Sequence, residues 1–417
     1  MNILFVHQNL PAQFVHLAPA LIGRGHKVTG LTASTNTLNI PYPVARYGWK
    51  PRSFDPNVFE LATTYAEMIN RARIVAEAAQ ELKERANLQP DLIVSNPGWG
   101  ESILLKEVWP EAHHLVYAEF FYRTHGLDTD FDPELQKQDL KMHLWITSRQ
   151  AHLLHAFHSA DSLIVPTEWQ KKVLPHYIQP MTSVIHDGVD TQRIRPAEGK
   201  MSVTIPGTSL KFQTGDEVLT FVNRNLEPYR GYHIFMRALP QVLRERPNAQ
   251  VVIVGGDDRS YSPRAPAGTT WKQMYLDEVK DRIDLSRVHF VGRVPYATLN
   301  DLMRVTRVHT YFTYPFVLSW SMLEAMAAGA LVVGSRTPPV EEIIEDGVNG
   351  RLVDFFDVDG LARTLIETLA NPRAFDGLRQ KARQTIVERY DLKSRCLPRL
   401  IDLVERCGKL DKTAAIA

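Results

Sequence analysis

Cysteine is almost absent from this sequence, with only Cys396 and Cys407 among 417 residues. Two thiols cannot build a disulfide framework or a cysteine-rich metal cluster, so a reducing compartment is expected. No stretch approaches the ~20 apolar residues that a membrane-spanning helix needs. Neither charge is in surplus, since 48 basic residues stand against 47 acidic ones. These absences predict a cytoplasmic protein with no transmembrane segment and no nucleic-acid partner, while peripheral contact with a membrane surface stays open.

Motifs for the common nucleotide cofactors are missing as well. A dinucleotide-binding chain carries G-x-G-x-x-G directly after its first strand, but the stretch HQNLPAQF at that place contains no glycine. No Walker A sequence occurs either. The first residues, MNILFVHQNLPAQF, lack a basic segment and have a broken apolar run, so we expect a buried strand there and no signal peptide. An NAD-dependent enzyme is therefore disfavoured, and neither a cofactor nor a metal is expected.

What the sequence does contain is an alternation of strands and helices that runs twice along the chain. Length favours two domains, because a domain usually holds ~100–200 residues. Unalternating apolar strands between helices are typical of parallel sheets covered on both faces. The expected strands are residues 2–7, 27–32, 91–96, 114–120, 162–166, 218–224, 250–255, 288–291, 308–314, 330–334 and 351–353. The main expected helices are residues 13–22, 58–84, 101–108, 133–158, 231–243, 271–281, 297–305, 320–328 and 358–369.

The two halves meet at residues 196–215, which show no periodicity and are expected to form a linker or long loop. The predicted fold class is α/β, with two doubly wound Rossmann-like domains whose strand ends face each other across a cleft. We expect an N-terminal domain over residues 1–208 and a C-terminal domain over 209–390. The remaining segment, 391–417, is expected to be a helix and tail that packs back on the first domain.

The densest polar motif, FVNRNLEPYRG, opens the second half directly after an apolar strand. Arg224 and Arg230 lie in the loop before a helix, and both could reach one anion beside the helix N-terminus. A diphosphate is the anion that suits two guanidinium groups. From spacing alone, the two arginines could equally be solvated surface residues.

A second motif, YPFVLSWSMLEAMAAG, begins at Tyr314. The apolar helix expected to begin near Ser319 would offer free backbone N–H groups to an anion. Glu324, in the first turns of that helix, could accept hydrogen bonds from sugar hydroxyls. Taken alone, a glutamate near a helix start is also typical of a capping residue or a partner of the helix dipole.

These segments resemble, in order and spacing, the retaining GT-B glycosyltransferases of family 4. In the second half the resemblance rests on Arg224 with Arg230-Gly231, and on the motifs HFVGRV, LEAMAAG and EDGVNG. In the first half, GHKVT resembles the family's second strand and HDGVD resembles its N-G-V-D segment. The resemblance implies metal-independent hexosyl transfer from a nucleotide diphosphate sugar to an acceptor hydroxyl with retention, as in polysaccharide biosynthesis. The first domain would be the acceptor side and the second would bind the nucleotide sugar.

The resemblance also implies roles for individual residues. Arg224 and Arg230 would bind the donor diphosphate, with Arg230 standing where a lysine is usual. Glu324 matches the second glutamate of the family's E-x7-E motif and would bind the ribose, while residues 292–296 would flank the base. A UDP-sugar is favoured over a GDP-sugar. The further donor-binding residues implied are Gly292, Val294, Phe316, Val317, Leu318, Ser319, Trp320 and Ser321.

Two departures from the family pattern bear on activity. Phe316 occupies the position of the first glutamate of E-x7-E, which in the family reaches the hydroxyls of the donor sugar. A phenyl ring cannot accept a hydrogen bond, so the departure affects donor specificity and, with it, turnover. The loop from Asn9 to Gln13 lacks the glycines that let backbone approach the donor. One alternative, which Phe316 motivates, is a non-catalytic nucleotide-sugar-binding protein, and another is a sugar-nucleotide epimerase of the same fold.

Candidate contacts in the first half follow its strands. Glu119, at the end of the strand 114–120, would touch an acceptor or donor sugar, or else pair with nearby Arg123. We count Glu119 with the two arginines as a catalytic candidate. The acceptor would be a glycan, a glycolipid or a small molecule. The acceptor-side candidates are His7, Asn9, Gln13 and His125.

The sequence DTD at Asp128 matches D-x-D, a metal motif of a different transferase fold. A match of three residues in an acidic loop is weak evidence for a metal. We interpret it as a solvated loop.

Overall fold

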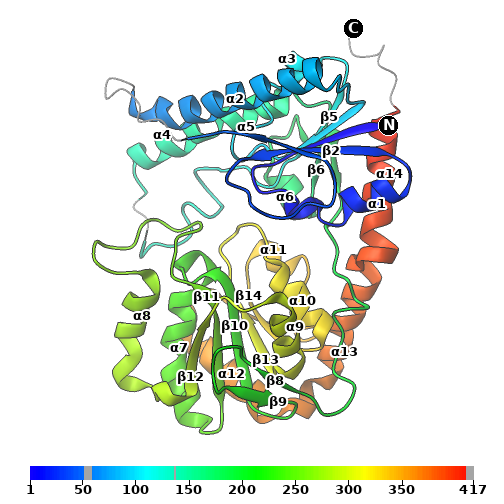
Figure 1. The fold of residues 1–417 in the computed structure, drawn as a ribbon. Helices are drawn as coiled ribbons and strands as arrows, with labels where there is room; N and C mark the ends of the chain where they lie inside the picture. The colour runs from blue at the N-terminus through cyan, green and yellow to red at the C-terminus, as the bar shows by residue number, and fades with distance from the viewer. Residues whose placement is uncertain (51–58, 136–137, 410–417) are drawn as a thin grey trace. The chain divides into compact units, whose positions relative to one another are not determined.

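The computed structural model describes residues 1–50, 59–135 and 138–409, which divide into two compact units (Figure 1). Unit 1 comprises residues 1–187 together with the segment from Lys393 onward, and unit 2 is Gly188–Leu392. The sequence placed the first boundary between residues 208 and 209, whereas the structure places it between 187 and 188. The second boundary, expected after residue 390, follows Leu392.

Unit 1 is built on a seven-stranded parallel sheet in the order β3-β2-β1-β4-β5-β6-β7. The central strand β1 is buried along almost its whole length, as expected for a strand covered on both faces. The two edge strands, β3 and β7, were not predicted, because their sequences, VARY and TSV, contain no continuous apolar run. The strands are β1 (Asn2–Val6), β2 (Lys27–Ala33), β3 (Val44–Tyr47), β4 (Leu92–Ser95), β5 (His113–Tyr117), β6 (Ser162–Val165) and β7 (Thr182–Val184).

Helices cover both faces of this sheet (Figure 1). One face carries α2 (Thr63–Arg85), α3 (Leu105–Val108), α4 (Leu140–Arg149) and α5 (Ala151–His158). The other carries α1 (Leu17–Gly23) and α14 (Leu397–Cys407), while α6 (Glu168–Val173) packs against β6 and β7. The single helix expected over residues 133–158 is two helices, and the first begins where the Asp139 side chain caps the N–H of Met142.

The last helix, α14, belongs to the core of unit 1 although it follows the whole of unit 2 in sequence. Leu400, Leu403 and Val404 pack in the same hydrophobic cluster as Phe5 of β1. At the edge of that cluster, Glu405 forms an ion pair with Arg24 just after α1.

Unit 2 carries a six-stranded parallel sheet in the order β12-β11-β10-β13-β14-β15. Its helices again lie on both faces, with α7, α8 and α12 on one side and α9, α10, α11 and α13 on the other (Figure 1). The strands are β10 (Val218–Asn225), β11 (Gln250–Gly256), β12 (Val288–Gly292), β13 (Val308–Tyr311), β14 (Leu331–Ser335) and β15 (Arg351–Val353). The helices are α7 (Tyr232–Glu245), α8 (Trp271–Val279), α9 (Tyr296–Val305), α10 (Trp320–Ala328), α11 (Pro338–Glu341), α12 (Val358–Ala370) and α13 (Asp376–Thr385).

Residues 196–215 are not the plain linker that the sequence predicted. They hold an antiparallel hairpin of β8 (Ser202–Thr204) and β9 (Lys211–Gln213). Val203 and Phe212 are buried in the core of unit 2. The prediction was wrong because each strand has three residues and one buried side chain, so no alternation is visible.

In each sheet the strand order reverses beside the first strand, between β1 and β4 in unit 1 and between β10 and β13 in unit 2. Ligands of open parallel sheets bind at such points, outside the carboxyl ends of the strands. Along the described part of the chain, no helix combines the length and the apolar character needed to cross a bilayer.

Candidate active site

The carboxyl end of β10 leads through a short 3-10 turn, η4 (Pro228–Arg230), into α7. Gly231 joins the two with a φ of 69°, a left-handed conformation that glycine adopts without strain. The turn lies against Phe312, the residue after β13. This junction brings Arg230 to the point where the strand order of unit 2 reverses.

Arg230 is buried there, and only part of its guanidinium is engaged. Its Nη1 donates to Thr313 Oγ1 at 2.9 Å and to the carbonyl of Val317 at 2.8 Å. The guanidinium carbon lies 5.2 Å from the centre of the Tyr261 ring and 5.6 Å from that of Phe316. Nε and Nη2 donate to none of the described residues. A buried cation with open donors in a fixed orientation is suited to bind an anion.

Arg224, at the end of β10, differs from Arg230 in being exposed. Within the described ranges its guanidinium makes no hydrogen bond or ion pair. Arg293, by contrast, is engaged, because its Nη2 donates to Asn225 at 3.2 Å and to Asp258 at 3.1 Å. The structure therefore brings the two predicted arginines to the end of the same strand, one buried and one in solvent.

Glu227, between the two arginines, anchors a loop that follows β11. Its buried carboxylate accepts hydrogen bonds from the backbone N–H groups of Ser260, Tyr261 and Ser262 at 3.0–3.2 Å. Tyr261 is thereby held over Arg230. The sequence analysis missed Glu227, because its partners lie 33 to 35 residues further along the chain.

The loop after β13 ends at Ser319, the N-cap of α10. The Ser319 hydroxyl accepts a hydrogen bond from the N–H of Ser321, and the N–H of Ser319 donates to the Tyr311 hydroxyl at 2.6 Å. Two of the backbone amides predicted for a phosphate are thus already engaged within unit 2. Val317 and Leu318 are half-buried. Trp320 is exposed and Ser321 is buried.

Glu324, on the first turns of α10, is engaged through one of its two oxygens. Oε1 accepts a hydrogen bond from the hydroxyl of Tyr296, the first residue of α9. Oε2 accepts none from the described residues, and it is not among the enclosed side-chain atoms that lack a partner. Burial raises the pKa of Glu324, while the hydrogen bond from Tyr296 and the charge of Arg193 act to lower it.

Phe316 does not lie in the open position that a sugar-binding glutamate would need. Its side chain is 4% exposed, and its ring centre lies 4.8 Å from that of Tyr261 and 5.6 Å from that of Tyr229. The ring closes an aromatic cluster around Arg230. The polar function expected of a glutamate at this position is therefore replaced by packing.

Gly292 and Val294, predicted beside the base, follow the end of β12. Gly292 is exposed and has a φ of 62°. Val294 is half-buried and packs against the core of unit 2. Both precede Tyr296 on the segment that leads to Glu324.

In unit 1, His7 and Trp99 meet where the strand order reverses, with ring centres 5.1 Å apart. Burial lowers the pKa of His7 to about 4, and its Nδ1 accepts a hydrogen bond from the N–H of Asn9 at 2.9 Å. Asn9 is exposed. Gln13 is half-buried, and its side-chain nitrogen is enclosed without a hydrogen bond to any described residue. Of the acceptor-side candidates, His7 and Asn9 are thus in direct contact.

Arg71 of α2 was not predicted, although it reaches the same end of the sheet. Its Nη1 donates to Gln8 Oε1 at 2.7 Å, and its guanidinium carbon lies 3.7 Å from the centre of the Trp49 ring. No sequence motif marks a lone arginine in the middle of a long helix.

Glu119 lies just beyond β5 and is half-buried. Asn96 donates to its Oε2 at 3.3 Å, and its backbone carbonyl accepts a hydrogen bond from the Gln170 side chain. The alternative partner, Arg123, donates to the carbonyl of Leu174 at 3.1 Å. Glu119 is therefore tied to the residue that follows β4.

The loop after Glu119 corrects one expectation. Asp128 of the D-x-D match is fully buried, so the interpretation as a solvated loop is wrong for it. The loop folds on itself, since Thr129 donates to the Arg123 carbonyl and the N–H of Gly126 donates to Asp130. His125 is exposed, with Nδ1 3.6 Å from the Asp130 carboxylate.

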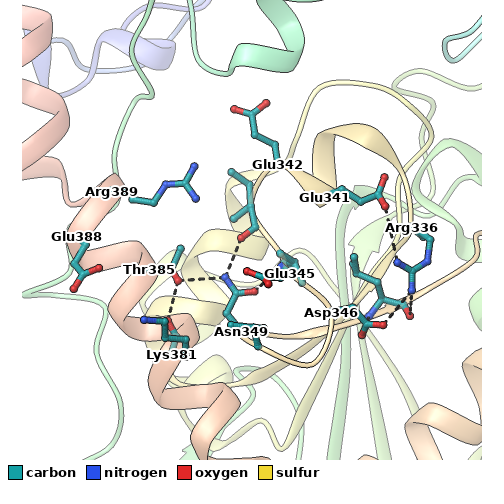
Figure 2. A pocket seen from close by; sticks show the side chains of 14 residues that line it. Arg336, Glu341, Glu342, Glu345, Asp346, Asn349, Lys381, Thr385, Glu388 and Arg389 are labelled. Carbon is teal, nitrogen blue, oxygen red and sulfur yellow. Dashed lines mark hydrogen bonds and ion pairs between the residues drawn. The ribbon is translucent and has the colours of Figure 1, made fainter.

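A separate cavity of about 500 Å³ lies in unit 2 between the EDGVNG loop and α13 (Figure 2). The side chain of Asn349 forms part of its floor. It accepts a hydrogen bond from the N–H of Glu345 and donates to the Ile343 carbonyl and the Thr385 hydroxyl. On the rim, Arg336 is paired with acidic neighbours. Both the oxygen and the nitrogen of the Asn349 side chain have hydrogen-bond partners, and acidic neighbours balance the charge of Arg336 on the rim. We therefore assign no ligand to this cavity.

Comparisons with known proteins cover most of the chain. A sequence profile described as the glycosyl transferase family 4 group matches residues 24–194, and one described as glycosyl transferases group 1 matches residues 216–371. A phosphatidyl-myo-inositol mannosyltransferase of Mycolicibacterium smegmatis is 31% identical over 177 residues, which are 41% of this chain and 40% of that protein. A glycogen synthase of Mycobacterium tuberculosis is 24% identical over 426 aligned positions, covering 94% of this chain and 91% of that one. The match to the mannosyltransferase thus spans less than half of that relative's length.

Solved structures support the fold class. A sucrose-phosphate synthase from Thermosynechococcus elongatus has a TM-score of 0.70 at 18% identity, covering 97% of this chain and 98% of that one. Anabaena HepE, in complex with UDP-glucose, has a TM-score of 0.64 at 18% identity, covering 97% of this chain and 100% of that one. The predicted α/β class with two doubly wound parallel sheets is confirmed.

Proposed function

Because the chain belongs to the family 4, group 1 glycosyltransferases and has their GT-B fold class, we propose that it transfers a hexose from a nucleotide diphosphate sugar to an acceptor hydroxyl with retention of configuration. In this proposal the donor binds to unit 2, and Glu119 and the residues around His7 contact the acceptor or the sugar in unit 1. The enzyme works without a metal ion.

One observation carries the donor assignment. Arg230 hydrogen-bonds Val317 in the loop before α10, Glu324 lies on α10 itself, and each uses part of its charged group to bind the protein. The guanidinium keeps Nε and Nη2 for an anion, and the carboxylate keeps Oε2 for a hydroxyl. A nucleoside diphosphate has both complementary groups, since its phosphates would meet the arginine and its ribose would meet the glutamate.

The chemistry would rest on positive charge placed at the leaving group. Charge develops on the departing diphosphate in an oxocarbenium-like transition state, and fixed donors aimed at it lower the barrier. Buried Arg230 supplies a pre-oriented cation, and exposed Arg224 supplies a second one at the end of the same strand. One such contact is worth ~3–4 kcal/mol in the transition state. With retention, the acceptor attacks from the face that the diphosphate leaves, and a phosphate oxygen takes the proton.

The donor is proposed to be a UDP-sugar, in line with the HepE structure in complex with UDP-glucose. The acceptor is proposed to be a glycan, a glycolipid or a small molecule. Relatives named as a phosphatidyl-myo-inositol mannosyltransferase and a glycogen synthase are in keeping with that range. A cytoplasmic location, with peripheral membrane contact left open, completes the proposal.

The test is a comparison of thermal stability with UDP, GDP, ADP and dTDP and with their glucose conjugates, followed by release of nucleotide in the presence of acceptors. A ligand at 100 times its dissociation constant adds roughly 2.7 kcal/mol to the free energy of unfolding. Stabilisation by UDP and UDP-glucose is the expected result. If none of the eight compounds stabilises the protein, the donor assignment is withdrawn.

Phe316 supports a second candidate, a protein that binds the nucleotide sugar without turnover. The buried phenyl ring offers no acceptor to the sugar hydroxyls where the family has a glutamate. This candidate predicts that UDP-glucose binds but that no UDP is released with any acceptor of the panel. Sustained UDP release by the unmodified protein would exclude it.

A further inference from the structure

Tyr296 connects the carboxylate of Glu324 to a cation on the surface of unit 2. Its hydroxyl donates to Oε1 of Glu324, whose side chain is almost fully buried. The guanidinium carbon of Arg193 lies 5.0 Å from the centre of its ring. One tyrosine therefore contacts an anion through its hydroxyl and a cation through its ring face, and 44% of its surface stays exposed.

We infer that Tyr296 is a positioning residue for Glu324, holding Oε1 so that Oε2 remains as the acceptor for a ribose hydroxyl. The inference rests on the proposed function, because the ribose is that of the proposed donor. It assigns to the phenol a role that acts through the carboxylate and involves no direct contact with the reacting atoms.

The start of α9 restricts the backbone at Tyr296, and the surroundings of the phenol keep it neutral. Pro295 is the N-cap of α9, with φ −55° and ψ 144°, so Tyr296 begins the helix from a restricted position. Burial and the neighbouring Glu324 charge raise the pKa of the phenol, while Arg193 and a hydrogen bond with Asn300 lower it. The phenol thus remains a neutral hydrogen-bond donor throughout the physiological pH range.

A glutamate needs such a partner at this depth. An isolated buried carboxylate becomes protonated, because burial disfavours its charge. A protonated carboxyl loses part of its capacity to accept hydrogen bonds from a sugar. The bond from Tyr296 opposes the effect of burial on Glu324 and also restricts the rotation of its side chain. The second oxygen, Oε2, is then held in one orientation in which it can accept a hydrogen bond from a hydroxyl.

The experiment compares two nucleotides in the full-length protein by isothermal titration calorimetry. The probes are UDP and 2′,3′-dideoxyuridine diphosphate, which lacks the ribose hydroxyls, or the same pair with whichever base stabilises the protein most in the nucleotide panel. The unmodified protein is expected to prefer the ribonucleotide. Tyr296→Phe should lower the affinity for the ribonucleotide about tenfold, which is the value of one hydrogen bond to a charged group. The affinity for the dideoxynucleotide should stay nearly unchanged.

A matched control is Tyr232→Phe in the same unit. It removes a phenol that donates to the carbonyl of Lys272 on α8, so the preference for the ribonucleotide should be retained. Equal weakening of both nucleotides by Tyr296→Phe would overturn the inference, since it would mean that the ring serves packing or the base. Unchanged affinity for both would overturn it as well. Failure of the unmodified protein to bind any nucleotide would instead overturn the proposed function, and the inference with it.

Discussion

A Cβ atom on Gly231 would lie 2.3 Å from the Cβ of Phe312. No side chain fits between these two residues, so the turn that carries Arg230 lies directly against the end of β13. The contact places the guanidinium within hydrogen-bonding distance of Thr313. The geometry of the Arg230 guanidinium, the proposed anion-binding group, therefore depends on the glycine next to it.

Gly231→Ala should lower the free energy of unfolding by about 3 kcal/mol, combining left-handed backbone strain with overpacking against Phe312. Gly207→Ala is the matched control, because Gly207 has a φ of 74° but no atom within 4 Å of an added Cβ. That variant should show only the backbone part, about 1–2 kcal/mol. Urea denaturation measures the free energy of unfolding of both variants. Equal losses of stability would mean that the end of β13 moves to make room for the new methyl group, so that no overpacking remains.

Glu227→Gln should destabilise unit 2 by about 2–3 kcal/mol, because an amide replaces a buried carboxylate that accepts from three backbone N–H groups. It should also weaken nucleotide binding, since Tyr261 would no longer be held over Arg230. Glu245→Gln, at the exposed end of α7, is the control and should change neither quantity. Denaturation and calorimetry on the same samples check both effects, and a stable Glu227→Gln variant would contradict the anchoring role.

Arg224→Ala should leave the fold intact and reduce turnover by about 100- to 1000-fold, the loss typical of one preorganised contact to developing charge. The residue is exposed and has no described partner, so the melting temperature should stay the same. Arg244→Ala, on an exposed face of α7, tests whether loss of any surface arginine has the same effect. Turnover like that of the unmodified protein would remove Arg224 from the diphosphate site.

The lowered pKa of His7 implies that the free energy of unfolding depends on pH. Its pKa is about 4 in the folded protein and 6.5 in the unfolded chain. Between these two pH values the unfolded state binds more protons than the folded state. The contribution of neutral His7 to the free energy of unfolding is therefore fully present above pH 6.5 and is lost as the pH falls towards 4. From pH 7 to pH 5 this group alone should lower the free energy of unfolding by about 2 kcal/mol.

His7→Asn should remove that part of the pH slope, since the asparagine oxygen can still accept the hydrogen bond from Asn9. Urea denaturation of the variant and of the unmodified protein at pH 7 and pH 5 gives the two slopes. An unchanged slope in His7→Asn would mean that the imidazole is hydrated in the folded protein.

The central strands of both sheets could be predicted because a parallel strand buried on both faces is a continuous apolar run. Strand β1 illustrates this, and its bounds differ from the prediction by one residue. The edge strands β3 and β7 and the hairpin β8–β9 could not, because these short strands contain no continuous apolar run. The burial of Asp128 could not be predicted for another reason, because it results from a loop that folds on itself.

The candidate site residues of unit 2 could be placed in the fold from the sequence, but their contacts could not be predicted. Arg230 and Glu324 lie in motifs beside an apolar strand and an apolar helix, and these motifs fix their place at the strand ends. Their state depends on distant partners, since Thr313 is 83 residues from Arg230 and Tyr296 is 28 residues from Glu324. Phe316 was expected beside the sugar, and no pattern within its own motif indicates that it packs against Tyr261.

The return of α14 to unit 1 sets an order of events during synthesis. The segment 1–187 leaves the ribosome first, but the apolar surface around Phe5 lacks Leu400, Leu403 and Val404 until the whole of unit 2 has been translated. Unit 2 is one uninterrupted stretch of the chain and can fold as soon as it has left the ribosome. The N-terminal part of unit 1 therefore lacks the helix that completes its core until more than 200 further residues have been added.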